Sequence, residues 1–198
     1  SGSNGSSANG NNGGNGGGPL GGQGGVTRGN GKAPGGGGSS FQGQDGVGGK
    51  GLIIISYSCP DSNKDDCITV IDDGAKSGTT IIEYTCDDTW IAPEGLAEFT
   101  VYVGSGGGGG GSGEGSGGGG SGSIIKQTFT TTNPYGLPAG ATFPITVGQG
   151  GLGAQTINAN GFDGKPSTFT GSVNGSAVNI SVPGGGGGGS QSANAGGN

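Results

Sequence analysis

Runs of consecutive glycines constrain this chain more than any other feature of its sequence. The longest are 106–111 and 184–189, and glycine accounts for 58 of the 198 residues, against a usual share of about 7%. Collagen needs Gly at every third position and abundant proline, whereas these runs break that period and the chain has only 9 prolines. The runs suit instead an extended left-handed helix with three residues per turn and ~3.1 Å rise per residue.

An ordered bundle of such helices is the fold that we expect from these runs. The helix has no internal hydrogen bonds, so its N–H and C=O groups must pair with neighbouring strands. Strands without side chains can approach closely and pair on several sides, which offsets the high entropic cost of ordering glycine. A flexible Gly/Ser linker is the alternative. The glycines that we expect to make the assembly contacts are Gly35, Gly38, Gly106, Gly108, Gly111, Gly184, Gly186 and Gly189.

The rest of the sequence indicates a small β-sheet core. Three zones follow one another: a glycine-rich half-domain over 1–50, a small β-sheet unit over 51–103, and a glycine-rich half-domain with inserted strands over 104–198. Short apolar runs rich in β-branched residues predict strands at 52–58, 67–71, 79–84 and 98–103. No segment keeps an apolar period of 3.6 residues. The fold class is therefore all-β with a polyglycine II-like helix bundle and essentially no α-helix.

The two ends of the chain read as two halves of one glycine-rich domain. Residues 182–198 open a glycine-rich stretch, and residues 1–57 begin in a stretch of the same composition and close on a strand. We expect the C-terminal half of one unit to pack with the N-terminal half of the next, since an incomplete edge recruits another chain and propagates as an open filament. In a competing arrangement both ends fold back within one chain.

Several motifs carry a resemblance to a known family. Residues 89–95 read TWIAPEG and lead through a strand into the run 106–111; FPITVG at 143–148 and NGFDGKPSTF at 160–169 follow. Together they resemble the glycine-rich domains of large bacterial surface proteins, found in Bacteroidetes-type secreted proteins and in phage tail adhesins. The closing motif of that family resembles residues 48–57, which here precede the opening motif.

The resemblance implies an extracellular structural protein at a cell surface. The function that we expect is head-to-tail assembly of identical units into a filament, the glycine-rich halves of neighbours completing one another. The alternative is a receptor-binding adhesin that uses loops of the glycine bundle, with a cell surface or its glycans as partner. A third reading is an ice-binding bundle, for which only 128–132 offers a flat threonine array.

The cysteines and one acidic loop are further candidate sites. We favour a disulfide between Cys59 and Cys67, with Cys86 either a free thiol or a link to another chain, although Cys86 could reach either of the others. Three cysteines without histidine fall short of a zinc site. A calcium loop is suggested by Asp61, Asn63, Asp65 and Asp72; because Asp66 stands where such a loop needs glycine, a solvated acidic turn is the other reading.

Composition argues against catalysis and against several partners. The chain has no histidine, so it has no imidazole base and no Ser–His or Cys–His pair. Patterns such as 104–109 match GxGxxG by chance in a glycine-rich chain, and no alternating helix surrounds them. A net charge of −6 disfavours nucleic acid, and the run 52–55 is far too short to span a bilayer. We expect no enzyme activity and no cofactor, Ca²⁺ apart.

Overall fold

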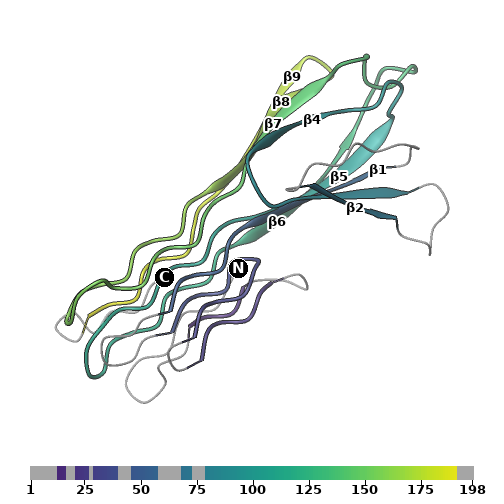
Figure 1. The fold of residues 1–198 in the computed structure, drawn as a ribbon. Helices are drawn as coiled ribbons and strands as arrows, with labels where there is room; N and C mark the ends of the chain where they lie inside the picture. The colour runs from purple at the N-terminus through teal and green to yellow at the C-terminus, as the bar shows by residue number, and fades with distance from the viewer. Residues whose placement is uncertain are drawn as a thin grey trace.

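The computed structural model describes residues 13–16, 21–26, 29–39, 46–57, 68–72 and 79–190 of the chain. They form two parts joined end to end: two β-sheets packed together, and an elongated bundle of wavy extended tracts (Figure 1). The described residues contain no helix, and both sheets are antiparallel. The expected fold class, all-β with a glycine-rich extended bundle, is therefore confirmed.

The first sheet has the strand order β2-β3-β1-β5-β6. Its strands are β1 (Leu52–Tyr57), β2 (Ile68–Asp72), β3 (Thr80–Tyr84), β5 (Glu98–Gly104) and β6 (Ile124–Thr130). In β5 the alternation seen in the sequence decides which side chains are buried: Phe99, Val101 and Val103 are within the core, while Thr100 and Tyr102 are only half-buried. This is the pattern of a strand that covers a core with one face.

The second sheet has the order β4-β7-β8-β9. Its strands are β4 (Asp88–Ile91), β7 (Thr142–Thr146), β8 (Ser167–Val173) and β9 (Ser176–Val182). A two-residue turn joins β8 to β9, and its residues Asn174 and Gly175 have positive φ values of 55° and 75°. An Asn-Gly turn of this kind matches the twist of the two strands and fixes their register.

The sequence predicts strands at the positions of β1, β2, β3 and β5, and its FPITVG motif at 143–148 overlaps β7, but it does not locate the other four strands. In β8 and β9 the missed signal is local: the Asn174-Gly175 dipeptide stands between two segments of alternating apolar residues. Apolar and polar residues alternate only weakly in β6, because this strand lies at the edge of its sheet and most of its side chains are exposed. Strand β4 has only four residues, and because Trp90 is the only buried one, it shows no apolar run.

An aromatic cluster joins the two sheets into a sandwich. Trp90 of β4 lies edge-on to Phe99 of β5, with ring centroids 4.9 Å apart. Phe143 and Phe169 stack at 5.2 Å within the second sheet, and Phe143 also meets Phe99 at 5.4 Å. All four rings are at most 2% exposed. Rings from strands far apart in the sequence thus hold the sandwich together, mainly through the apolar surface that they bury.

The sandwich strands continue directly into the tracts of the bundle (Figure 1). The pairing of Leu52 with Gly104, and of Gly104 with Ile124, sends three tracts out of the first sheet side by side. At the junction the buried Ser167 hydroxyl donates to Gly104 O at 2.7 Å, and the Ser105 hydroxyl donates to Pro183 O at 2.6 Å. The register of the sheets therefore sets the register in which the glycine tracts meet.

Candidate functional site

The tract 104–112 lies at the centre of the bundle and is here called the central tract. Every N–H from Ser105 to Ser112 donates to another tract, at 2.8 to 3.2 Å. The acceptors of Gly106 to Gly111 are, in order, Lys165, Gly49, Gly120, Phe162, Gly46 and Gly117. The N–H groups of three consecutive residues thus bond to three different tracts, and the N–H of the fourth residue bonds to the first of these tracts again. This is the three-residue period of the polyglycine II helix.

Six tracts surround the central tract. Its N–H groups bond to three of them, and its carbonyls accept from Gly185, Gly151, Gly38, Gly188 and Ala154, which belong to the other three. The six tracts are 34–39, 46–51, 116–123, 147–154, 159–165 and 183–190. Each is also bonded to the next around the ring, as Gly48 N–H is to Gly151 O at 2.8 Å. The packing is therefore closed on all sides, and it is made of backbone alone.

This packing explains why the central run is uninterrupted glycine. A Cβ added at Gly108 would lie 2.5 Å from Gly186 C and still closer to its oxygen. At Gly111 an added Cβ would come within 2.6 Å of Gly188 O. The atoms it would meet belong to backbone, which cannot rotate away as a side chain can. Any other residue here would have to force two tracts apart.

A second tract, 34–39, is surrounded in the same way. It bonds to the central tract, to 46–51 and 116–123, and to the N-terminal tracts 13–16, 21–26 and 29–32. An added Cβ at Gly38 would lie 2.5 Å from Gly46 C. Tract 34–39 is therefore enclosed by six neighbouring tracts, like the central tract, and the two carry the glycine runs 35–38 and 106–111.

In two outer tracts, 147–154 and 159–165, a side chain recurs at every third residue and faces outward. Gln149, Leu152 and Gln155 follow this spacing along one tract, and Phe162 and Lys165 follow it on the next; all five are exposed. The same period marks Asn160 and Asp163, whose side-chain oxygens accept from Ser190 N–H and Gly187 N–H at 2.7 Å. The three-residue spacing of single side chains was readable in the sequence and marks these two tracts as outer ones.

The predicted assembly glycines all lie in the bundle of a single chain. Gly38 N–H donates to Gly108 O at 2.8 Å, and Gly119 N–H donates to Gly38 O at 2.9 Å. The N-terminal and C-terminal glycine-rich halves thus complete one another, as expected, but within one chain. For the described tracts, the structure shows the competing arrangement, in which both ends fold back within one chain. The pairing of β1 with β5 brings the N-terminal tract 46–51 beside the central tract before any second chain is needed.

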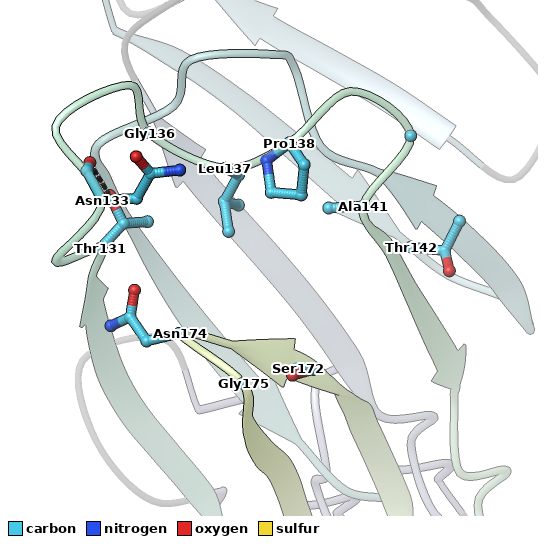
Figure 2. A pocket seen from close by; sticks show the side chains of 11 residues that line it. Thr131, Asn133, Gly136, Leu137, Pro138, Ala141, Thr142, Ser172, Asn174 and Gly175 are labelled. Atoms are coloured by element: carbon cyan, nitrogen blue, oxygen red, sulfur yellow. Dashed lines mark hydrogen bonds between the residues drawn. The ribbon is translucent and has the colours of Figure 1, made fainter.

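The loops after β6 and between β8 and β9 lie at the end of the sandwich opposite the bundle (Figure 1). They enclose a pocket, which we call the tip pocket (Figure 2). Its volume is about 410 Å³, and it lies between the loop after β6 and the turn between β8 and β9. The lining includes Thr131, Asn133, Leu137, Thr142, Ser172 and Asn174. Thr131 and Asn133 are at one end and Thr142 at the other, with Leu137 between them (Figure 2).

Hydrogen bonds of Asn174 tie the two walls of the tip pocket together. Its Oδ1 accepts from Thr132 N–H at 2.9 Å, and its Nδ2 donates to Thr130 O at 3.1 Å. Asn133 Oδ1 accepts from Tyr135 N–H at 3.1 Å. The sequence alone does not single out these residues, because nothing in the local pattern shows that two distant loops meet.

A family model described as a glycine-rich domain matches residues 80–198, which is more than half of the chain. The chain belongs to this glycine-rich domain family. The match covers the central tract and four tracts of its ring, but not the N-terminal tracts 13–51. No curated protein and no solved structure matches this glycine-rich domain.

The cysteine prediction needs a correction. Cys86, between β3 and β4, is disulfide-bonded in this glycine-rich domain, so the free thiol expected there is wrong. The chain has only two other cysteines, Cys59 and Cys67, and both lie outside the described residues. A bond from Cys86 within the chain uses one of them, so it is incompatible with the predicted Cys59–Cys67 bridge. Sequence spacing favoured the short ring because it cannot show which strand ends meet.

The calcium prediction falls mostly outside the described residues. This applies to Asp61, Asn63 and Asp65, while Asp72 is the last residue of β2. Within the described part of the chain, no group of three or more cysteine or acidic residues is placed to hold a metal ion. The same part has no helix long and apolar enough to cross a membrane.

Proposed function

We propose that this glycine-rich domain is an extracellular, non-enzymatic structural module that acts as a receptor-binding adhesin. The bundle is a stiff support, and the loops at the far end of the sandwich make the contact. The observation that carries the proposal is the closure of the bundle within one chain. A unit that completes its own support needs no neighbour to fold, and it leaves the opposite end free for another molecule.

The bundle is well suited to be a support. Its tracts are bonded to neighbours in three directions, so bending it in any direction would break backbone hydrogen bonds. The tracts are continuous with the sandwich strands, so the orientation of the bundle is passed on to the loops at the tip. Such loops on a rigid scaffold are where binding residues are usually found.

Two further observations support the extracellular, non-enzymatic part of the proposal. A disulfide bond at Cys86 is typical of an oxidising compartment. The chain has no histidine, and none of the residues that line the tip pocket is ionisable, which leaves no group for acid–base chemistry there. The resemblance of residues 89–111 and 137–169 to bacterial surface proteins and phage tail adhesins points the same way.

Binding of the labelled protein to intact bacterial and eukaryotic cells tests the proposal. We expect Tyr135→Ser, in the loop after β6 where the side chain is 84% exposed, to weaken binding. The matched control is Ile157→Ser, an equally drastic change of a 73% exposed side chain in a loop of the bundle. If Ile157→Ser lost binding while Tyr135→Ser kept it, the contact with the cell would lie on the bundle, which would contradict the proposal.

Filament assembly is the second candidate function, supported by the N-terminal tracts. Residues 13–16, 21–26 and 29–32 form an outer layer on tract 34–39, held mainly by backbone hydrogen bonds. Tract 34–39 of one chain can form the same backbone hydrogen bonds with the outer layer of a neighbouring chain. If each chain passes its outer layer to the next in this way, the assembly grows head to tail. Negative-stain microscopy of the full chain and of a deletion of 1–45 tests this. A full-length protein that remains monomeric at high concentration would eliminate the filament.

A further inference from the structure

We infer that the tip pocket binds an uncharged sugar unit, so that the ligand of the adhesin is a neutral glycan. The inference rests on the proposed function and adds the chemical class of its ligand. The volume of about 410 Å³ falls within the range of small-ligand sites, which combine apolar walls with a few convergent polar groups.

The polar groups of the pocket match the hydroxyls of a sugar. The hydroxyls of Thr142 and Ser172 line the pocket and form no hydrogen bond with the described residues. A hydroxyl can donate and accept at once, as each sugar hydroxyl also can. The Asn133 amide adds donors: its Oδ1 is engaged by Tyr135 N–H, which orients the Nδ2 group. A ring with several neighbouring hydroxyls can satisfy these groups together.

The apolar part of the pocket suits the C–H face of a sugar ring. Three apolar side chains line the pocket: Leu137, which is 3% exposed, the exposed Pro138 and the half-buried Ala141. A sugar ring presents polar groups at its edge and C–H groups on its faces. It would therefore bury apolar surface against these side chains while its hydroxyls bond to the rim.

The absence of charge selects a neutral ligand over an acidic one. The lining of the tip pocket contains no Asp, Glu, Lys or Arg. A carboxylate or phosphate placed there would lose hydration without gaining a counter-charge. The net charge of −6 adds a general repulsion of anions. Sialylated, uronic and phosphorylated ligands are therefore disfavoured.

The pocket is also held in one shape before a ligand arrives. Asn174 joins the turn between β8 and β9 to the last residue of β6 and to the loop that follows it, with one hydrogen bond to each. Gly136, in the same loop, has a φ of 75° and packs against Gly95, so a Cβ there would collide with backbone. Because the walls are already fixed, the loops lose little conformational entropy when a ligand binds, and this raises the affinity for a small ligand.

An immobilised panel of neutral oligosaccharides, with sialylated and uronic acid-containing ones beside it, tests this inference. We expect binding to members of the neutral set and roughly ten-fold weaker binding by Thr142→Val, since it removes one hydrogen bond to the ligand. The matched control is Thr146→Val, the same change at an exposed position of the same strand outside the pocket. Binding only to charged oligosaccharides, or to none, would overturn the inference.

Periodate treatment of target cells separates this inference from the proposed function, because periodate destroys vicinal diols of sugars. Cell binding that persists after treatment would leave the adhesin role intact and remove the sugar ligand. Binding to neutral oligosaccharides without any binding to cells would keep the pocket and remove the adhesin role. Loss of cell binding after treatment, together with a selective effect of Thr142→Val, supports both.

Discussion

The bundle and the sandwich of this protein are stabilised in opposite ways. In the sandwich, side chains such as Phe99, Phe143 and Phe169 fill the space between the sheets, and the backbone is paired within each sheet. In the centre of the bundle no side chain is present, and the backbone of the central tract is paired in every direction. The comparison shows that close packing can be reached by filling space with side chains or by removing them.

The two parts also differ in how far each can stand alone. A typical backbone hydrogen bond contributes only about 1 kcal/mol net, and ordering glycine costs more entropy than ordering any other residue. The bundle therefore depends on strands that already hold its tracts in register. The sandwich has an apolar core of its own, so we expect damage to the sandwich to affect both parts, and damage to the bundle to remain there.

The largest effect is expected from Gly108→Val in the central tract. The new side chain would collide with the backbone of Gly186, and we expect the bundle to lose about 5 kcal/mol, the upper end of single substitutions. Hydrogen exchange should show that 106–111 and 184–189 lose amide protection while β7 to β9 keep theirs. Gln149→Val, at an exposed position of a neighbouring tract, is the control and should change little. Intact protection in the Gly108 variant would contradict backbone-only packing.

Phe143→Ala tests the sandwich in the same comparison. Phe143 is fully buried and contacts Trp90, Phe99 and Phe169, so its truncation should cost about 3–4 kcal/mol through lost burial and a cavity. Denaturant unfolding followed by tryptophan fluorescence measures the loss. Because the bundle needs the sandwich, protection of 106–111 should fall together with that of β7. A bundle that stays protected would mean that the two parts fold independently.

A smaller effect is expected from Cys86→Ser. Loss of a disulfide costs about 2–3 kcal/mol, and Cys86 lies between β3 and β4, where the neighbouring Asp87 accepts from Val147 N–H at the junction of sandwich and bundle. Peptide mapping under non-reducing conditions should recover Cys86 linked to Cys59 or to Cys67. A Cys59–Cys67 peptide with a free Cys86 thiol would restore the original pairing.

The smallest effect is expected at the outer surface of the bundle. Asp163→Ala removes the oxygen that accepts from Gly187 N–H at 2.7 Å, which should cost about 1 kcal/mol and speed exchange of that amide. Asp163→Asn keeps an acceptor oxygen and should retain most of the stability. Equal losses in both variants would show that the charge, and not the hydrogen bond, stabilises the outer tract.

Some of this arrangement follows from particular residues. The glycine runs 35–38 and 106–111 predicted tracts that pack without room for a Cβ, and the alternation in 98–103 predicted the buried face of β5. The tip pocket was not predictable, because Asn133 and Asn174 come from loops more than 40 positions apart in the sequence and meet only when the two sheets pack. The free thiol expected at Cys86 failed for a similar reason, because sequence spacing does not show that Cys86 is bonded.

The sequence by itself determined that this chain forms extended glycine helices beside a small β core, because only glycine permits the close approach of backbones and only alternating apolar residues build a one-sided core. The tertiary structure alone decided that the two glycine-rich halves meet within one chain. A glycine tract carries no side-chain information about its partner, since its N–H and C=O groups fit any other tract equally well. The choice was made by the strands, whose pairing, above all that of β1 with β5, places particular tracts side by side.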